Sequence, residues 1–310
     1  MIPVLPDVVV RPLQTEDSPQ VSELLNGVLA GTPYSIPFDA NALAAQFYQA
    51  NPPTLYPVRW QSHARLGAWR ARRLEGFIDV AVGLDSDSLA LPDYQPFGLL
   101  RFLVLPTKPE AANAVAMDLL EAAEQFWRQA GIGYVKAFHL STGYPTFQAG
   151  AGVLPGDWVE QMRVLTGAGY FLVDRFYCLR RPLDQPIEEV MPLAGLSLVL
   201  RGNPGDRTYL LYRRAEWVGT ARVTGLLWHS ETGPLRIANL IDLQIEKQWR
   251  RMNIGKWLLR RLINDAIVEG YQQMLVHVAQ SQQAVLNLVS QLGFIEENYR
   301  GYTLEKALTR

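Results

Sequence analysis

One stretch of the chain joins an apolar strand, a basic loop and an amphipathic helix. The strand reads LIDLQI (240–245), the loop reads RRMNIGK (250–256), and a second apolar strand, MLVHV (274–278), follows the helix. Apolar residues of the helix recur at spacings of three and four, as on the buried face of a surface helix. This order predicts a βαβ unit, which places the loop at the carboxyl end of the first strand.

The loop has the properties of an anion-binding site. The first turn of a helix leaves backbone N–H groups without partners, and the helix dipole adds partial positive charge at the same end. Gly255 allows a ligand to approach the backbone closely, while Arg250, Arg251 and Lys256 can supply positive charge. We therefore predict that this loop binds an anionic ligand.

The order of motifs around the loop resembles the GNAT superfamily of acyl-CoA-dependent N-acyltransferases. The segment reads L-x-I-x-x-x-W-R-R-M-N-I-G-K-W-L-L, and V-H-V and A-V-L-N-L-V-S-Q-L-G-F follow it. In that family a loop of the form Q/R-x-x-G-x-G/A holds the pyrophosphate of coenzyme A. Arg250, Asn253 and Gly255 stand at its three defined positions. Asn253 replaces the first glycine, and asparagine is the next-best residue at a positive φ.

The resemblance implies acetyl-CoA as the cosubstrate, together with a set of residues that bind it. In the family, the strand before the loop diverges from its neighbour and offers backbone groups to the acyl carbonyl and the pantetheine arm. A residue early in the following helix also contacts that arm. The positions implied here are Leu243, Gln244, Ile245, Arg250, Arg251, Met252, Asn253, Ile254, Gly255, Lys256 and Gln282.

The catalytic positions depart from the family pattern. Val289 stands where many members have a tyrosine that protonates the departing thiolate, and Asn239 stands where some have a carboxylate base. Two carboxylates on the first strand are the remaining candidates. Asp242 interrupts an apolar strand, and it is either a general base or a paired structural aspartate. Glu246 lies at the strand end, where a solvated surface role is the simpler interpretation.

Other ionisable residues are weaker candidates for a catalytic or metal-binding role. His277 alternates with valines on a strand that faces the predicted cleft and can carry a proton, although a hydrogen-bonded structural histidine is the simpler interpretation. Cys178 is the only cysteine, so no internal disulfide can form, and we assign it to the core of a strand. The four histidines show no metal-ligand spacing, and no metal site is predicted.

The C-terminal pattern recurs in the N-terminal half. A Leu-Leu pair precedes a glycine at the same spacing in residues 119–131 and 258–270, with apolar strands on either side. This arrangement resembles the tandem architecture of mycothiol synthase-like proteins. We expect an α/β (α+β) fold of two GNAT-like domains, 1–183 and 195–310, with a linker at 184–194. Each domain is expected to have a mixed, mostly antiparallel central sheet with helices on both faces.

The N-terminal copy has lost the loop chemistry. Ala111, Ala114 and Ala116 stand at the positions of Arg250, Asn253 and Gly255, so neither charge nor glycine remains there. We expect this copy to act as a scaffold or to help form the substrate cleft. Its aromatic segment, Tyr34 to Trp60, falls where GNAT proteins often place acceptor-binding helices, although core packing explains these aromatic residues equally well.

Composition limits the partners. Hydrophobic residues make up 48%, charged residues 19%, and the formal net charge is −1, which gives no reason to expect nucleic acid or an anionic membrane. A basic start with a sustained apolar run is missing from the N-terminus, and we expect a cytoplasmic protein. The sequence does not fix the oligomeric state, and a homodimer is among the states that it allows.

Two functional interpretations follow from the sequence. The first is an acetyl-CoA-dependent N-acetyltransferase that acts on a small-molecule amine or on a peptide or protein amine. The second is a catalytically silent GNAT-fold protein that binds acyl-CoA or a partner as a sensor or scaffold. The basic loop favours the enzyme, whereas Val289 and Asn239 favour the silent protein.

Overall fold

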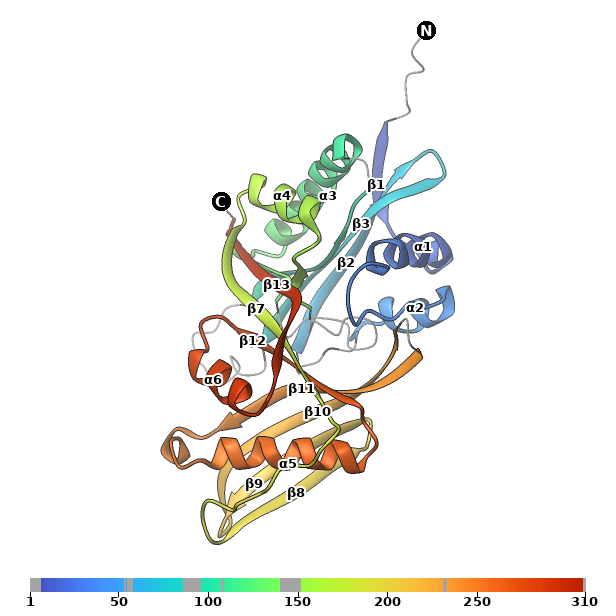
Figure 1. Cartoon of the computed structure of the whole chain (residues 1–310). Coiled ribbons are helices and arrows are strands. Elements are labelled where there is room, and N and C mark those ends of the chain that lie inside the picture. Colours follow the sequence, from blue (N-terminus) through green and yellow to red (C-terminus); the bar gives the residue numbers. More distant parts are fainter. Residues whose placement is uncertain are drawn as a thin grey trace. The chain divides into compact units, whose positions relative to one another are not determined.

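The computed structural model describes residues 7–52, 54, 58–85, 96–106, 109–139, 152–230 and 233–308. The chain divides into two compact units: unit 1 comprises Met1–Arg175 with Gly301–Arg310, and unit 2 comprises Phe176–Arg300. Both units are mixed α/β structures with mostly antiparallel sheets, as the repeat predicted (Figure 1). In the described ranges, no helix is long and apolar enough to cross a membrane.

The units differ from the linear boundaries 1–183 and 195–310 because each repeat gives its last strand to the other unit's sheet. Strand β7 (Phe171–Pro182) closes the first repeat, yet its residues from Phe176 onward pair antiparallel with β12 (Gln273–Ala279) in unit 2. Strand β13 (Ile295–Ala307) closes the second repeat, yet its end pairs antiparallel with β5 (Tyr134–Ala137) in unit 1.

Unit 1 is a sheet covered by helices on both faces. Its strands run in the order β1-β2-β3-β4-β5-β13, antiparallel except for the parallel pair of β4 and β5. Figure 1 shows α1 and α2 on one face and α3 and α4 on the other. The new elements are β1 (Val8–Pro12), β2 (Val58–Arg70), β3 (Arg73–Asp85), β4 (Phe97–Val104), β6 (Leu154–Pro155), the 3-10 helix η1 (Thr15–Asp17), α1 (Ser18–Leu29), α2 (Ala40–Phe47), α3 (Pro109–Gln129) and α4 (Val159–Gly167).

Helix α3 confirms the helix predicted to end near Gly131, which adopts a φ of 72°. Its buried Trp127 donates a hydrogen bond from Nε1 to the Ala81 carbonyl oxygen at 3.0 Å, which ties the helix to β3. Gly98 on β4 lies beneath this ring, since a Cβ there would come within 2.9 Å of the indole. The tryptophan ring therefore occupies the space that a side chain at position 98 of β4 would need.

A cluster of charged residues is buried in unit 1, which we call the ionic cluster (Arg65, Asp79 and Arg101). The side chains of Asp79 and Arg101 have no exposed surface, and Nη1 of Arg101 lies 3.5 Å from Oδ2 of Asp79. Arg65 Nε lies 3.8 Å from the other carboxylate oxygen. Arg101 is the extra residue of a β-bulge between β3 and β4, and bulges commonly re-aim a side chain. Its guanidinium carbon lies 4.8 Å from the centre of the Trp60 ring.

The free energy of unfolding is expected to fall as the pH is lowered from 6.5 to about 4. Burial lowers the pKa of His63, the neighbour of the ionic cluster, from 6.5 to about 4, while the Asp79 carboxylate partly opposes this shift. Between these values the unfolded chain binds a proton that the folded chain does not, so stability is highest above pH 6.5 and decreases toward pH 4. Urea unfolding across this range should show a smaller slope for His63→Gln, and an unchanged slope would contradict the assignment.

Unit 2 repeats the sheet of unit 1 without two of its helices. Its strands run in the order β7-β12-β11-β10-β9-β8, and β8 joins β9 through a turn at Pro204 and Gly205. Asn203 Oδ1 accepts hydrogen bonds from the backbone N–H of Gly205 and Asp206 at 2.9 and 3.1 Å. The new elements are β8 (Leu196–Asn203), β9 (Asp206–Arg213), β10 (Glu216–Ser230), β11 (Gly233–Ile245), the 3-10 helix η4 (Lys247–Trp249), α5 (Ile254–Val268) and α6 (Gln283–Gln291).

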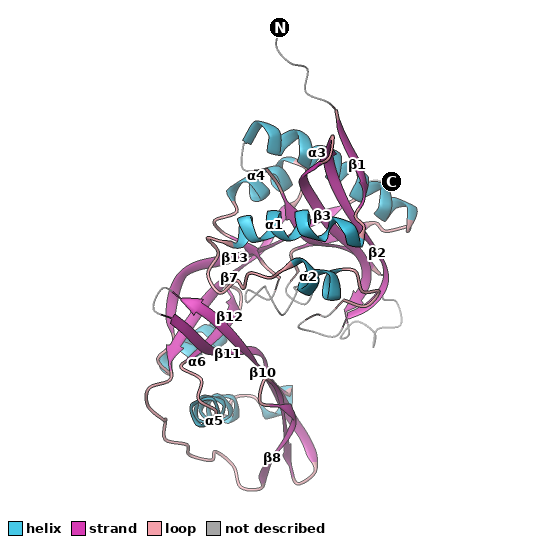
Figure 2. Ribbon diagram, turned by 90° about the vertical axis from the view of Figure 1, so that its right-hand side faces the viewer, coloured by secondary structure: helices cyan, strands magenta, loops and turns pink. Residues whose placement is uncertain are grey.

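The turn between β8 and β9 leaves no room for counterparts of α1 and α2. Helices on both faces were expected in each domain, and unit 1 has them. In unit 2, α5 and α6 contribute to one and the same core cluster. Figure 2 shows α5 end-on along one side of the strands of this unit. The described part of unit 2 therefore presents the other face of its sheet without a covering helix of its own.

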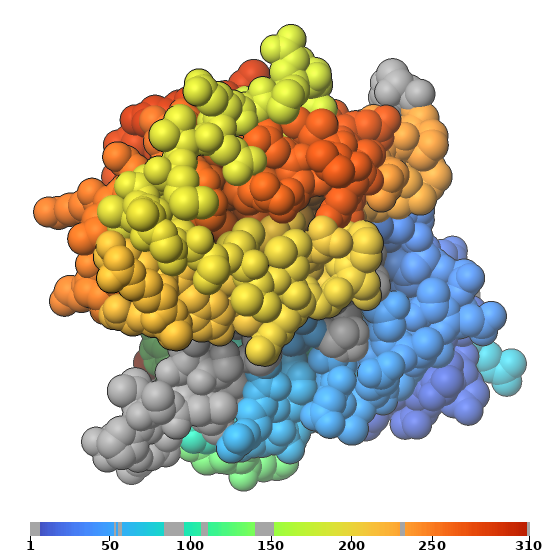
Figure 3. Space-filling view, turned by 90° about the horizontal axis from the view of Figure 1, so that it is seen from below, coloured from blue at the N-terminus to red at the C-terminus, as the bar shows by residue number. Residues whose placement is uncertain are grey.

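The predicted linker is an ordered part of unit 2. The Asn264 side chain, on α5, accepts a hydrogen bond from the backbone N–H of Ile187 at 2.8 Å and donates one to its carbonyl oxygen at 2.8 Å. The same amide donates to Glu189 at 2.7 Å. Figure 3 shows the yellow-green linker lying over the orange α5. Asn264 thus holds Ile187 and Glu189 of the linker against the helix.

Candidate functional site

Two neighbouring strands of unit 2 diverge where the candidate site begins. Strands β11 and β12 pair in parallel only from Ile237 opposite Gln273 to Leu240 opposite Val276. Beyond this point β11 pairs with β10 and β12 pairs with β7. The pairing of β11 with β10 shifts by one residue at Ile241, and such a bulge bends its strand. The predicted divergence before the loop is therefore confirmed.

The faces of the diverging strands follow from their alternation. Leu243 and Ile245 pack against the core cluster that includes α5, so Asp242 and Gln244 stand on the opposite face of β11. The neighbours of His277 on β12 also belong to that cluster, which turns the imidazole to the same side as Asp242. We call this side, opposite α5, the open face.

The loop between β11 and α5 enters the helix through left-handed backbone. Arg251 has a φ of 64° and Asn253 a φ of 58°, so asparagine does occupy the positive φ expected for the first glycine of the motif. Asn253 caps α5 without a side-chain hydrogen bond to the first turn. The backbone N–H groups at the start of α5 are thus left to other acceptors, as an anion site requires.

Gly255 lies in the first turn of α5, and nothing in the folded chain demands a glycine there. A Cβ at this position would meet only Cγ1 of Ile245 at 3.7 Å and Cδ2 of Leu243 at 3.9 Å, which are ordinary contacts. Its φ is also outside the left-handed region. A longer side chain at this position would project between the helix N-terminus and the end of β11.

Positive charge surrounds that space. Arg250 is exposed, and its Nε donates a hydrogen bond to the Ile245 carbonyl oxygen at 2.8 Å, which holds the guanidinium at the end of β11. Lys256 donates a hydrogen bond to Gln291 Oε1 at 3.3 Å. Arg251 and Met252 are exposed on the loop between them. Uncapped N–H groups, a glycine in the first turn and cationic side chains together suit an anionic ligand.

The comparisons with known proteins agree with this geometry. Residues 176–294 match the family model of the acetyltransferase (GNAT) family. This segment therefore carries the sequence pattern of that family. No curated protein gives a significant match to the sequence.

Solved structures extend the GNAT fold to the whole chain. A tandem GNAT protein from the clavulanic acid biosynthesis pathway is 15% identical with a TM-score of 0.65, and the match covers 98% of this chain and 99% of that one. A GCN5-related N-acetyltransferase from Sphaerobacter thermophilus is 13% identical with a TM-score of 0.60, covering 98% and 97%. At these identities the similarity establishes a tandem GNAT fold and nothing finer.

A third similar structure is part of a larger protein. It is a GCN5-related glucosamine N-acetyltransferase region of a fungal multi-domain GH3 β-N-acetylglucosaminidase, 12% identical with a TM-score of 0.73. The match covers 98% of this chain, which spans 38% of that protein.

The family's usual catalytic positions carry no titratable group in this segment. Val289 is buried in the core at 1% exposure, and Asn239 is buried at 5%. Glu246 is exposed and accepts a hydrogen bond from Trp217 Nε1 at 3.1 Å, and its catalytic role stays a prediction. Gln282 is exposed at the N-cap of α6, and its contact with the pantetheine arm stays a prediction.

Asp242 has a structural neighbour that the sequence did not reveal. It is partly buried and stands directly across from Arg222 on β10. Arg222 also forms a bidentate pair with Asp206, at 2.8 Å from Nε and 2.7 Å from Nη2. Because Arg222 lies twenty residues earlier in the chain, no local pattern joins it to Asp242. This neighbour favours the structural interpretation of Asp242, whose catalytic role stays a prediction.

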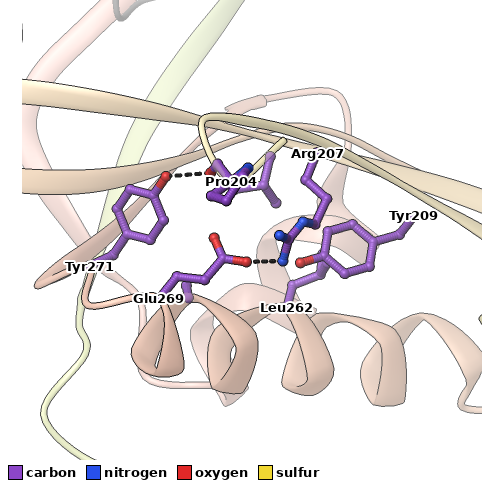
Figure 4. A pocket seen from close by; sticks show the side chains of 8 residues that line it. Pro204, Arg207, Tyr209, Leu262, Glu269 and Tyr271 are labelled. Atoms are coloured by element: carbon purple, nitrogen blue, oxygen red, sulfur yellow. Dashed lines mark hydrogen bonds and ion pairs between the residues drawn. The ribbon is translucent and has the colours of Figure 1, made fainter. Parts of the chain in front are cut away.

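A small pocket lies at the other end of α5 and is a packing feature. Its volume is about 10 Å³, which is room for about one water molecule. An ion pair between Arg207 and Glu269 closes one side, and Tyr271 donates a hydrogen bond to the Pro204 carbonyl oxygen at 2.7 Å on another (Figure 4). The ion pair and the hydrogen bond join the end of α5 to the start of β9.

Proposed function

We propose that the protein is an acetyl-CoA-dependent N-acetyltransferase whose cofactor site is formed by residues 243–256 of unit 2. The observation that carries this proposal is a glycine that the fold does not require, Gly255, placed between the uncapped N-terminus of α5 and the end of the diverging β11. A loop that served only as a turn would have no reason to combine this glycine with Arg250, Arg251 and Lys256.

Each part of the proposed site has a separate task. The N–H groups of α5 and the cationic side chains of the loop bind the pyrophosphate. Backbone groups of Leu243, Gln244 and Ile245 bind the pantetheine arm and polarise the acyl carbonyl. Holding the thioester in this geometry lets a neutral amine attack it directly. In unit 1 the matching alanines lie within helix α3, which supports a single cofactor site in unit 2.

Calorimetric titration with acetyl-CoA and with free coenzyme A is the direct test. Micromolar binding of both would support the site, and thiol release would then be followed with glucosamine, phenylethylamine, lysine and a short peptide as acceptors. These cover a sugar amine, as in the name of the fungal relative, an apolar amine, an amino acid and a protein terminus. Absence of binding at millimolar ligand would remove the proposal.

A catalytically silent acyl-CoA-binding protein is the second candidate. Val289 and Asn239, both buried at the family's usual catalytic positions, favour it, because neither side chain can transfer a proton. Binding of acetyl-CoA without thiol release for any class of amine would select this function over the enzyme.

Replacing Arg250 with alanine should weaken acetyl-CoA binding about 10-fold, because a charge-assisted hydrogen bond to phosphate contributes roughly 1.5 kcal/mol or more. The side chain is exposed, so the thermal midpoint should stay nearly unchanged. Arg201→Ala, at another exposed position of unit 2, is the matched control and should bind like the parent. Equal affinity of the two variants would show that Arg250 makes no cofactor contact.

A further inference from the structure

His277 has a distinct position among the histidines of the chain. It is the first residue of β12 beyond Val276, where the pairing with β11 ends. Its side chain lies on the open face, the same side as Asp242. In a GNAT domain, the divergence of these strands is where the acyl group is expected. An imidazole at this point borders the proposed reaction centre.

The surroundings of the ring do not explain why the residue is a histidine. Tyr299 contacts it in a perpendicular arrangement, with ring centres 6.1 Å apart at 89°. Cys178 stands directly across from it on β7 and is fully buried. The ring nitrogen Nε2 is buried, and no described residue gives it a hydrogen bond. A hydrogen-bonded structural histidine, the simpler expectation from the sequence, would have such a partner.

Burial keeps both His277 and its neighbour Cys178 uncharged at neutral pH. Burial raises the pKa of the Cys178 thiol, which therefore stays uncharged at neutral pH. Burial lowers the pKa of His277 itself to about 4, so the ring is neutral at pH 7. The residue as a whole remains partly exposed. A neutral imidazole has one unprotonated ring nitrogen, which can accept a proton.

We propose that His277 is the proton carrier of acetyl transfer, an inference that rests on the proposed function. As the amine nitrogen forms its bond to the acetyl carbon, a ring nitrogen of His277 accepts the proton that the amine loses. As the bond between that carbon and sulfur breaks, the imidazolium gives the same proton to the sulfur. The products are the amide and the free thiol, and the ring returns to its neutral form. One residue thus replaces the acid that Val289 cannot supply.

The test compares His277→Gln and His277→Ala with the parent protein. For the acceptor that gives the fastest thiol release, kcat should fall on the order of 100-fold in both variants, the usual contribution of general acid–base catalysis. The dissociation constant for acetyl-CoA should stay unchanged. Added imidazole should restore part of the rate of His277→Ala, which loss of a structural contact would not permit. His229→Gln, at an exposed histidine on β10, is the matched control and should keep the parental rate.

A second readout does not depend on turnover. In NMR spectra of the parent protein, imidazole resonances that disappear in His277→Gln should shift when acetyl-CoA is added, whereas those of His229 should not. An unchanged kcat, a loss of acetyl-CoA affinity without rescue by imidazole, or the absence of an NMR shift would each overturn the role of His277. Loss of turnover in Asp242→Asn but not in the His277 variants would assign the proton to Asp242. Failure of the parent protein to bind acetyl-CoA would instead remove the proposed function itself.

Discussion

Replacing Gly255 with leucine is expected to lower the affinity for acetyl-CoA by more than about 100-fold, or roughly 2.7 kcal/mol, without unfolding the protein. The new side chain would start within van der Waals contact of Ile245 and Leu243 and would fill the space at the N-terminus of α5. Because the position is helical and not left-handed, the fold itself should gain up to about 0.8 kcal/mol from the better helix former. Calorimetric titration and thermal unfolding measure the two effects.

Gly27 offers a matched control for this substitution. It lies inside α1, and a Cβ there would meet no atom within 4 Å. Gly27→Leu should therefore show the same small change in stability and no change in cofactor affinity. Gly255→Ala should fall between the parent and the leucine variant. Parental affinity in Gly255→Leu would mean that the cofactor does not use this loop.

Replacing Asp79 with alanine is expected to destabilise unit 1 by about 3–5 kcal/mol, because the buried Arg101 would lose the carboxylate that it faces. Urea unfolding followed by tryptophan fluorescence measures this change, and several tryptophans of unit 1, Trp127 among them, report on it. The double variant with leucine at both positions should recover a large part of the loss, since well-packed apolar residues can replace a buried ion pair.

An exposed ion pair in the same unit provides the comparison. Glu160 lies 2.8 Å from Arg163 on α4, with exposed fractions of 31% and 49%. Glu160→Ala should change the unfolding free energy by less than about 1 kcal/mol, because solvent screens such a pair. A similar small effect for Asp79→Ala would show that Arg101 is stabilised by other contacts.

Local features of the site could be predicted from the sequence. The period of its apolar residues predicted α5, and the residues of the loop predicted both its place after β11 and a left-handed Asn253. These properties depend on neighbours within a few residues. The resemblance to GNAT proteins also predicted that β11 diverges from β12. Only the strand register in the structure establishes this divergence.

Other features depend on residues that are far apart in the chain. Asp79 and Arg101 meet across two strands, and each lies in a run of apolar residues that gives no sign of a partner. The neighbour of Asp242, Arg222, is likewise fixed by strand register. The lack of helices between β8 and β9 did have a local sign. Residues 203–206 read NPGD, which is a turn between two strands and too short for anything else.

Because the repeats exchange their last strands, the two units cannot be completed one after the other during synthesis. Ribosomes deliver the first repeat early, yet the segment Gly301–Arg310 that completes unit 1 emerges only after residues 176–300 of unit 2. Until then the edge of β5 that pairs with β13 has no strand beside it, and such edges invite pairing with other chains. Unit 1 therefore cannot finish folding before the second repeat has been made. A nascent chain that stalls before Gly301 would be left with an open sheet edge.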